Sequence, residues 1–523
     1  MTILKLYFTL FAAFTMQSIL SAQPVIPNVL VDASASNAEC TIVINPKNPD
    51  YLMASTLPSI IYRSTDGGLT WTEDLISDFS IHPIVWDVVL AADTSGHFFC
   101  QGMDQNSLFR TLRSDDYGLT WGNETVFGDI GCTEDKSWMT VDKSPLSPYI
   151  GNIYSTWTLR HGSGCNTAGY FFVNHSDDAG QSWSARDTLD SDPSFVPPIG
   201  GGMSVGPSGE IGITWSGGLP NQIHFKKSTD GGNTWTASPI IVDNSVLPAN
   251  DYAAFIEHSV GATSQFTSLS YDISGGPYNG NLYCVWDDLR NGPENADIFL
   301  ARSIDGGQTW ETQRINDDTT TRNQILPTVA VDPSSGWVYV SYLDARLNKD
   351  NFDDTLNYYL AWSGDGGQTF QNIQVSQQPS TLTWLHSDYM GMDAYGGKVH
   401  LLWVGGNSAT GQQTWTACAT QSLLTVVPEA NALSEMLVYP AFPNPAIDFT
   451  TLDFRLSQPM SVSLKITDLK GCVVAKPFDE KKYQVGRHQV CLDHHVLKLL
   501  PGIYIAILST PSGAFSRKFE VFH

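Results

Sequence analysis

Aspartate and arginine recur at one place in several loops of this sequence, directly after a segment typical of a β-strand. The pattern Asp-x-Arg gives Asp288 with Arg290 and Asp344 with Arg346, and Arg160 lies at nearly the same place in an earlier loop. A guanidinium fork matches a carboxylate bidentately, so three such arginines can clamp one ligand carboxylate. Each Asp-x-Arg can equally be a local salt bridge that holds its own loop, worth about 0–1 kcal/mol where it is exposed. The choice depends on how the surrounding elements arrange these loops.

A repeated phrase indicates what those elements are. Its six copies follow the pattern Ser-x-Asp-x-Gly-x-Thr-Trp with small variations, and their aspartates are Asp66, Asp116, Asp178, Asp230, Asp305 and Asp365. An Asp side chain accepts hydrogen bonds from the backbone of a tight turn, and Gly supplies the positive φ that such a turn needs. We therefore interpret these six aspartates as structural. The phrase resembles the Asp box of the bacterial neuraminidase repeat family.

The Asp boxes punctuate a longer repeat. A strand-like phrase precedes each box, as at 280–286 and 336–342, and an inner-strand candidate such as 327–332 precedes that phrase. Each unit then holds four strands, the composition of a propeller blade, so residues 23–427 are predicted to form an all-β propeller. We count seven units, because 388–420 repeats the pattern without an Asp box, and expect 28–32 to close the ring as an outer strand. Six blades, the number found in sialidases, is the alternative.

The repeat ends before a linker-like stretch at 428–437, and residues 438–523 form a separate small β-sandwich in our interpretation. Strand patterns at 462–468 and 500–505 support this, and the Tyr-Pro-Ala-Phe-Pro-Asn-Pro run at 439–445 opens the domain. The segment resembles the type A C-terminal sorting domain of type IX secretion, although that family usually runs Tyr-Pro-Asn-Pro without the inserted residues. The resemblance implies the type IX machinery as a partner and a secreted or surface location in a Gram-negative bacterium.

The N-terminus and the composition agree with export. Lys5, the apolar stretch 6–16 and the small residues Ser21 and Ala22 are typical of a signal peptide over residues 1–22. The chain carries 53 Asp and Glu against 28 Lys and Arg, a net charge of -25. Such a surface repels nucleic acid and anionic membranes, so we expect neither as a partner. No later stretch is apolar enough for a membrane span.

Strand parity places the loops of the predicted wheel on two rims. If the Asp boxes join third to fourth strands, the second-to-third loops and the connections between blades lie on the opposite rim, around the channel mouth. The sialidase resemblance implies a site there: Arg160, Arg290 and Arg346, with Asp288 and Asp344, for a sugar carboxylate, plus a Tyr nucleophile, a Glu and an acidic proton donor. By position, the catalytic candidates are Tyr389, Tyr252, Glu134, Glu257 and Asp251.

One departure from the family bears on that clamp. The Arg-Ile-Pro motif is absent and no arginine precedes Arg63, so the first arginine of the family's clamp has no counterpart at that place. Three functions are left open: a propeller that binds or acts on extracellular glycans, which we prefer, an active exo-sialidase, and a non-enzymatic adhesion or interaction scaffold. No cofactor is expected. The acidic loop 350–354 offers oxygen ligands for Ca²⁺ but lacks EF-hand spacing, and a solvated loop is the alternative.

Eight cysteines allow disulfides in an exported protein. Cys100 and Cys284 lie in strand-like runs and are expected to be buried free thiols. Cys132–Cys165 and Cys472–Cys491 are the pairs that the topology favours for a first test.

Overall fold

The computed structural model describes residues 25–522 apart from the segments 35–37, 58–59, 75–83, 130–131, 133, 160–168, 193–197, 218–221, 246–265, 293–294, 349–354, 382–388, 408–409, 425–435, 439–440, 442–445, 457, 469–472 and 511–512. The predicted signal peptide, 1–22, and most of the predicted linker, 428–437, lie outside the described residues. The chain divides into two compact units, Met1–Thr425 and Val426–His523.

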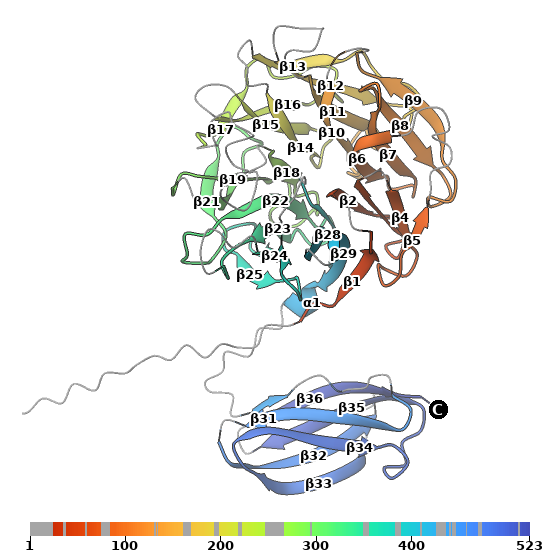
Figure 1. Ribbon diagram of the computed structural model, residues 1–523, viewed down its shortest axis with the longest axis vertical. Coiled ribbons are helices and arrows are strands. Elements are labelled where there is room, and N and C mark those ends of the chain that lie inside the picture. The colour runs from red at the N-terminus through yellow and green to blue at the C-terminus, as the bar shows by residue number, and fades with distance from the viewer. Residues whose placement is uncertain are drawn as a thin grey trace, which may run out of the picture. The chain divides into compact units, whose positions relative to one another are not determined.

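The first unit is a β-propeller, a wheel of antiparallel sheets set around a central channel (Figure 1). Seven sheets are formed by its described residues, and in the first six of them the four strands follow chain order from the channel outward. Blade 1 comprises β2 (Ala38–Ile44), β3 (Leu52–Leu57), β4 (Ile60–Ser64) and β5 (Thr72–Asp74); blade 2 comprises β6 (Ile84–Ala92), β7 (Phe98–Asp104), β8 (Phe109–Ser114) and β9 (Gly122–Phe127); blade 3 comprises β10 (Glu134–Val141), β11 (Ile153–Leu159), β12 (Gly169–Ser176) and β13 (Asp187–Asp192).

The following blades repeat this arrangement. Blade 4 comprises β14 (Ile199–Val205), β15 (Ile211–Gly217), β16 (Gln222–Ser228) and β17 (Ile240–Asp243); blade 5 comprises β18 (Ser268–Tyr271), β19 (Leu282–Asp288), β20 (Asp297–Ser303) and β21 (Glu311–Arg314); blade 6 comprises β22 (Gln324–Val331), β23 (Val338–Asp344), β24 (Thr355–Ser363) and β25 (Gln371–Gln374), with β26 (Ser380–Thr381) paired to β24. The second strands β19 and β23 are buried along their whole length, because a neighbouring blade covers each face of the sheet.

Blade 7 closes the wheel with the N-terminal strand, as predicted for residues 28–32. It comprises β27 (Gly391–Tyr395), β28 (Lys398–Asn407), β29 (Gly411–Thr420) and, outermost, β1 (Asn28–Asp32), which pairs antiparallel with β29. The helix α1 (Gln421–Leu424) follows β29. Asn28 Nδ2 donates to the Val375 carbonyl at 3.0 Å, and Asn28 Oδ1 accepts from the Gln377 amide at 2.7 Å. One side chain of the closing strand therefore also fastens the end of blade 6.

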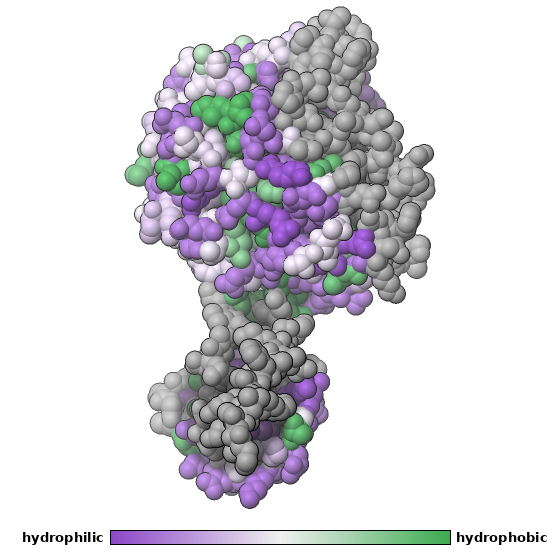
Figure 2. Space-filling model, turned by 90° about the vertical axis from the view of Figure 1, so that its left-hand side faces the viewer, coloured by the Kyte–Doolittle hydropathy of each residue, from purple (hydrophilic) through white to green (hydrophobic). Residues whose placement is uncertain are grey.

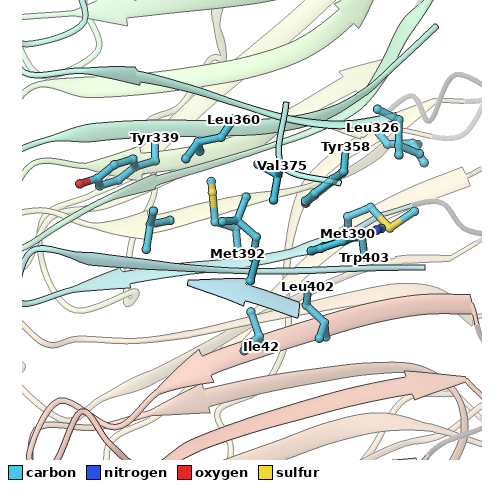
Figure 3. Packing of buried hydrophobic residues seen from close by; sticks show 14 of the residues in the cluster. Ile42, Leu326, Tyr339, Tyr358, Leu360, Val375, Met390, Met392, Leu402 and Trp403 are labelled. Atoms are coloured by element: carbon cyan, nitrogen blue, oxygen red, sulfur yellow. The ribbon is translucent and has the colours of Figure 1, made fainter. Parts of the chain in front are cut away.

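Apolar side chains fill the space between blades at this closure. Ile42 of blade 1, Tyr358 of blade 6 and Trp403 of blade 7 belong to one buried cluster (Figure 3). The rings of Tyr358 and Trp403 are stacked with their centroids 5.1 Å apart. Burial of large aromatic side chains is a main source of stability in such an interface.

The Asp boxes form the turns from third to fourth strand in blades 1–6. Around Asp230, the Ser228 hydroxyl donates to Asp230 Oδ1 at 2.8 Å, and the Thr234 amide and hydroxyl donate to its two carboxylate oxygens at 2.9 and 2.6 Å. Gly232 has a φ of 87° and donates its amide to Ser228 Oγ. Equivalent contacts occur at Asp66, Asp116, Asp178, Asp305 and Asp365. These are the contacts that the structural interpretation predicts, and they define one rim of the wheel, here named the Asp-box face.

The second unit is a β-sandwich. One sheet contains β30 (Met436–Val438), β31 (Phe449–Leu456) and β34 (Gly486–Asp493), and the other contains β33 (Val473–Tyr483), β32 (Met460–Asp468), β35 (Gly502–Thr510) and β36 (Gly513–Val521). Leu452 and Phe454 from the first sheet pack in one core with Leu464, Ile466 and Leu508 from the second. The two sheets therefore share their buried faces.

The cysteines correct one expectation. Cys100 and Cys284 are buried free thiols, as predicted. Cys132 is disulfide-bonded, and its expected partner Cys165 lies outside the described residues. The Cys472–Cys491 pairing is wrong, because Cys491 is a free, exposed thiol on the outward side of β34, next to Leu492, which points into the core.

The described surface is predominantly polar. Figure 2 shows one side of it as mainly hydrophilic with separate apolar patches, in agreement with the acidic composition. Among the described helices, none has the length and apolar character needed to cross a membrane.

Candidate functional site

The innermost strands of all seven blades line the central channel. They enclose a cavity of about 210 Å³ whose lining includes Thr41, Trp138, Ser268, Thr328 and Asp393. Because each blade starts with its innermost strand and the Asp boxes lie at the far end of the third strand, the innermost strands begin on the rim opposite the Asp boxes. We name this rim the loop face, because the second-to-third-strand loops and the connections between blades lie on it.

The backbone at the start of several innermost strands is bulged and strained. Glu39, Asp87, Lys136 and Leu326 have φ values of 43°, 53°, 41° and 56°, and each lies at a register shift of its strand. A left-handed conformation costs a non-glycine residue about 1–2 kcal/mol, and bulges re-aim side chains, often next to functional sites. Three of these four residues are charged, and they belong to the consecutive blades 1, 2 and 3. We therefore take the loop-face mouth of the channel as the candidate site.

Two carboxyl groups and one ammonium group meet there. Asp87 is 7% exposed, and its Oδ2 accepts the Lys136 amide at 3.0 Å. Burial raises the pKa of Asp87; the Lys136 charge and a hydrogen bond with the Glu39 side chain act in the opposite direction. Two neighbouring carboxyl groups at a buried site share protons, because ionising both is unfavourable. Asp87 is the member of the pair that holds its proton more firmly than a free aspartate.

Aromatic rings surround the ammonium group. Lys136 Nζ lies 3.0 Å from the ring centroid of Tyr389, 4.5 Å from that of Trp138 and 5.7 Å from that of Phe266. Tyr389 and Trp138 meet edge to face with centroids 5.7 Å apart. Tyr389 enters from blade 7, Trp138 from blade 3 and Phe266 from blade 5, so the cluster spans the mouth of the channel. We name Glu39, Asp87, Lys136, Trp138 and Tyr389 together the mouth cluster.

The predicted catalytic residues fall into three groups. Tyr389 is 5% exposed and belongs to the mouth cluster. Glu134 lies between blades 2 and 3, where its Oε1 accepts the Asp129 amide at 2.9 Å beside Trp157, and burial raises its pKa to about 7. The contacts of Glu134 are thus different from those of Tyr389, and the structure does not present the two as a pair. The candidates Tyr252, Glu257 and Asp251 lie outside the described residues.

Arg290 is held by one carboxylate of its own blade 5 and one of blade 4. Its Nη2 lies 2.6 Å from Asp288 Oδ2 and its Nη1 lies 3.3 Å from Asp243 Oδ2, while its guanidinium stacks 4.3 Å above the Phe299 ring. The Arg290 amide also donates to Asp288 Oδ1 at 2.8 Å, so the aspartate holds the turn as well as the guanidinium. Asp288 is buried, which makes Arg290 the partner that neutralises it.

Arg346 repeats this arrangement in blade 6. It contacts the buried Asp344, Asp317 and the Tyr342 hydroxyl, and its guanidinium lies 4.4 Å from the Tyr359 ring. These contacts, like those of Arg290, are the ones expected of local salt bridges; ligand binding by either arginine stays a prediction. Arg160 lies outside the described residues, and in blade 3 Arg186 stacks 4.2 Å from the Phe172 ring instead.

Sequence reasoning missed Glu39, Asp87 and Lys136, because each stands alone in its own unit of the repeat. The sequence nevertheless marks these positions by a constant offset from the end of each innermost strand. The innermost strands of blades 1, 2, 3, 5 and 6 are followed directly by Asn45, Asp93, Asp142, Asp272 and Asp332, and six residues before each of these lie Glu39, Asp87, Lys136, Phe266 and Leu326. The same offset from Tyr395, the last residue of β27 in blade 7, gives Tyr389. Aligning the repeats on these positions thus collects the residues of the channel mouth.

A metal centre finds no support among the described residues, where no group of three or more His, Cys, Asp or Glu side chains is placed to hold an ion. The acidic loop 350–354 lies outside them. The chemistry that the mouth cluster offers is therefore that of carboxyl groups, an ammonium group and aromatic rings.

Comparison with known proteins identifies the second unit. Residues 440–521 match the family described as the secretion system C-terminal sorting domain. The C-terminal unit is a type IX sorting domain. A chain that carries a sorting domain of this kind is secreted or carried to the cell surface of a Gram-negative bacterium, and it interacts with the secretion machinery. The expectations for location and for this partner are confirmed.

The propeller resembles sialidases more distantly. It is 22% identical over 353 residues to a sialidase of Micromonospora viridifaciens, a match that covers 61% of this chain and 49% of the relative. This chain thus spans about half the length of the curated relative. Among solved structures, the Hadza microbial sialidase Hz136 is 15% identical with a TM-score of 0.41, over 72% of this chain and 75% of that one. A protein of unknown function from Dyadobacter fermentans is 14% identical with a TM-score of 0.40, over 76% and 98%. Similarities of this size are consistent with the propeller fold and carry no argument on activity.

Proposed function

We propose that the propeller binds extracellular glycans, or cleaves them, at the loop-face mouth of its channel. The observation that supports this most is the mouth cluster itself, in which charged side chains on strained backbone converge with aromatic rings. Sites for small polar ligands combine apolar and aromatic walls with a few well-placed polar groups. Export by the sorting domain brings the propeller to where glycans are met, and the sialidase resemblance points to the same ligand class.

The cluster offers two schemes for hydrolysis. In the first, Asp87 acts as the general acid, because its raised pKa keeps a proton available, and Glu39 acts as the base or nucleophile. In the second, which the sialidase resemblance suggests, Tyr389 is the nucleophile and a neighbouring carboxyl group assists it. Binding without hydrolysis requires neither step and uses the same side chains.

The proposal is tested with the full chain on a panel of oligosaccharides, measuring binding and the release of reducing sugar. We expect Asp87→Asn to weaken binding or release about tenfold or more, since it removes a group at the mouth. Asp93→Asn is the matched control, because Asp93 directly follows β6, at the Asp-box end of the same strand. Equal activity of the two variants, or a wild type that neither binds nor cleaves any glycan, contradicts the proposal.

Two further variants separate the schemes if sugar is released. Glu39→Gln is expected to abolish release in the carboxyl-pair scheme, and Tyr389→Phe in the tyrosine scheme. If both variants bind glycan and the wild type releases none, the propeller is a binding module. A non-enzymatic protein-interaction scaffold is the interpretation that a complete lack of glycan binding would favour.

A further inference from the structure

Three described arginines of the loop face belong to the blades rather than to a ligand. Arg290, Arg346 and Arg110 each contact an aspartate whose side chain is fully buried, namely Asp288, Asp344 and Asp104. Turning any of these guanidiniums toward a ligand would leave a buried carboxylate without its counter-charge, which is among the costliest changes in a protein interior. Their second partners are the carboxylates of Asp243, Asp317 and Glu124.

The charges at the mouth itself also oppose an anionic ligand. Asp87 interacts with the ammonium of Lys136, which already lies against the Tyr389 ring, and Asp135 adds a further negative charge beside Asp87. Lys136 is 2% exposed, so it does not project toward solvent as a free cation. The chain as a whole carries a net charge of -25, which adds long-range repulsion for an incoming anion.

An exposed indole directly precedes one member of the carboxyl pair in the chain. Trp86 directly precedes Asp87 at the loop-face end of β6 and is 47% exposed, whereas Trp121, Trp157, Trp215, Trp286 and Trp403 are buried. An exposed tryptophan face packs against the C–H groups of a sugar ring without regard to its charge, and tryptophans are enriched among residues that dominate binding. A protonated amine on the ligand is attracted to both the indole face and the carboxyl pair.

From these observations we infer that the channel mouth selects uncharged and amino-bearing sugars and rejects carboxylated sugars, sialic acid among them. The inference rests on the proposed glycan function and names the substrate class of that site. Trp86 supplies the stacking surface, the carboxyl pair of Glu39 and Asp87 supplies hydrogen bonds and negative potential, and Arg110, Arg290 and Arg346 take no part in binding.

The test measures the affinity of the full chain for three oligosaccharides of equal length. These are a glucosamine tetramer, an N-acetylglucosamine tetramer and a galacturonic acid tetramer, with sialyllactose as a further carboxylated probe. We expect both carboxylated probes to bind at least about tenfold more weakly than the better of the other two. Glu39→Gln should narrow that difference, because it removes a negative charge at the mouth.

Two variants of the exposed surface separate the residues involved. Trp86→Ala is expected to weaken binding of the preferred tetramer about tenfold or more, and Leu347→Ala, which alters a 62% exposed residue of the same rim, should leave it unchanged. Arg290→Lys keeps a cation beside Asp288 and should also leave binding unchanged. The inference is overturned if a carboxylated probe binds most tightly, or if Arg290→Lys abolishes the binding of a carboxylated probe. The proposed function stands in either case. If the chain binds none of these probes and no other glycan, the proposed function itself is overturned.

Discussion

Aspartates in this chain have four different roles, and the role of each depends on its local backbone and its burial. Asp178 accepts hydrogen bonds in an Asp box, and Asp288 forms an ion pair with Arg290. Its neighbour Asp287 is fully buried, and burial raises the pKa of Asp287 to about 8, so that it is a neutral acid at pH 7. Asp87 lies in the carboxyl pair of the channel mouth. Residue type alone therefore says little about which aspartates belong to a site.

The third Asp box, around Asp178, offers a matched pair of aspartates for testing whether the box aspartate holds the turn. Asp178 accepts from the Ser176 hydroxyl at 2.8 Å and from the Ser182 amide and hydroxyl at 2.8 and 2.6 Å, whereas Asp177 is exposed beside it. We expect Asp178→Ala to lower the free energy of unfolding by about 1–3 kcal/mol, and Asp177→Ala to change it by less than about 0.5 kcal/mol. Equal effects in urea denaturation would refute the turn-holding role of the box aspartate.

At the scale of elements, the innermost strands position the candidate site and the outermost strand of blade 7 holds the wheel shut. The bulges in β2, β6 and β10 turn Glu39, Asp87 and Lys136 toward one end of the channel. The closing strand β1 comes from the opposite end of the propeller sequence, so its pairing with β29 converts a row of blades into a ring. Closure of this kind removes the free edges that the first and last blades would otherwise expose.

Asn28 is the residue through which closure can be tested. Asn28→Ala removes two hydrogen bonds between the closing strand and the end of blade 6, and we expect a loss of about 1–3 kcal/mol in the free energy of unfolding. Val25→Ala, at a position that is 73% exposed just before β1, is the control and should be neutral. If Asn28→Ala melts at the same temperature as the control, the two hydrogen bonds of Asn28 contribute nothing to the stability of the propeller.

Much of the propeller follows from its sequence, because the Asp boxes fix where third strands end and hence the parity of every other strand. The closing role of 28–32 and the placement of the Asp-x-Arg loops were predictable for that reason. The bulges that carry Glu39 and Lys136 to the channel mouth were not, because no residue type marks a departure from strand alternation; only the common six-residue offset indicates these two positions. The ion pairs of Arg290 and Arg346 depend on Asp243 and Asp317, which come from the preceding blade or the connection after it and meet the arginines only in the folded wheel.

For the whole molecule, buried carboxyl groups make stability depend on pH. Burial raises the pKa of Glu134 to about 7 and that of Asp287 to about 8. A carboxyl group whose pKa is raised by folding stabilises the native state fully below its unfolded pKa, and this contribution is lost as the pH rises through the folded value. The propeller is therefore expected to lose stability as the pH rises from about 4, near the ordinary pKa of these groups, to about 8.

Asp287→Asn isolates this effect, because the amide keeps the size of the side chain and cannot ionise. Between about pH 4 and pH 8, the free energy of unfolding of the wild type should fall by about 1.4 kcal/mol per pH unit more than that of the variant, the value for one proton, and the difference should level off above pH 8. Urea denaturation at pH 5, 6, 7 and 9 measures both the slopes and the levelling off, with Asp177→Asn as the exposed control. Parallel slopes of wild type and Asp287→Asn would show that Asp287 is already ionised in the folded protein.

We propose that this secreted propeller functions at the loop-face mouth of its channel, and a crystal structure of the full chain with the best-binding oligosaccharide tests that placement most directly. We predict a sugar ring against the Trp86 indole, within hydrogen-bond distance of Glu39 or Asp87 and without contact to Arg290 or Arg346. A sugar bound on the Asp-box face, or held at the loop face by those two guanidiniums, would contradict it.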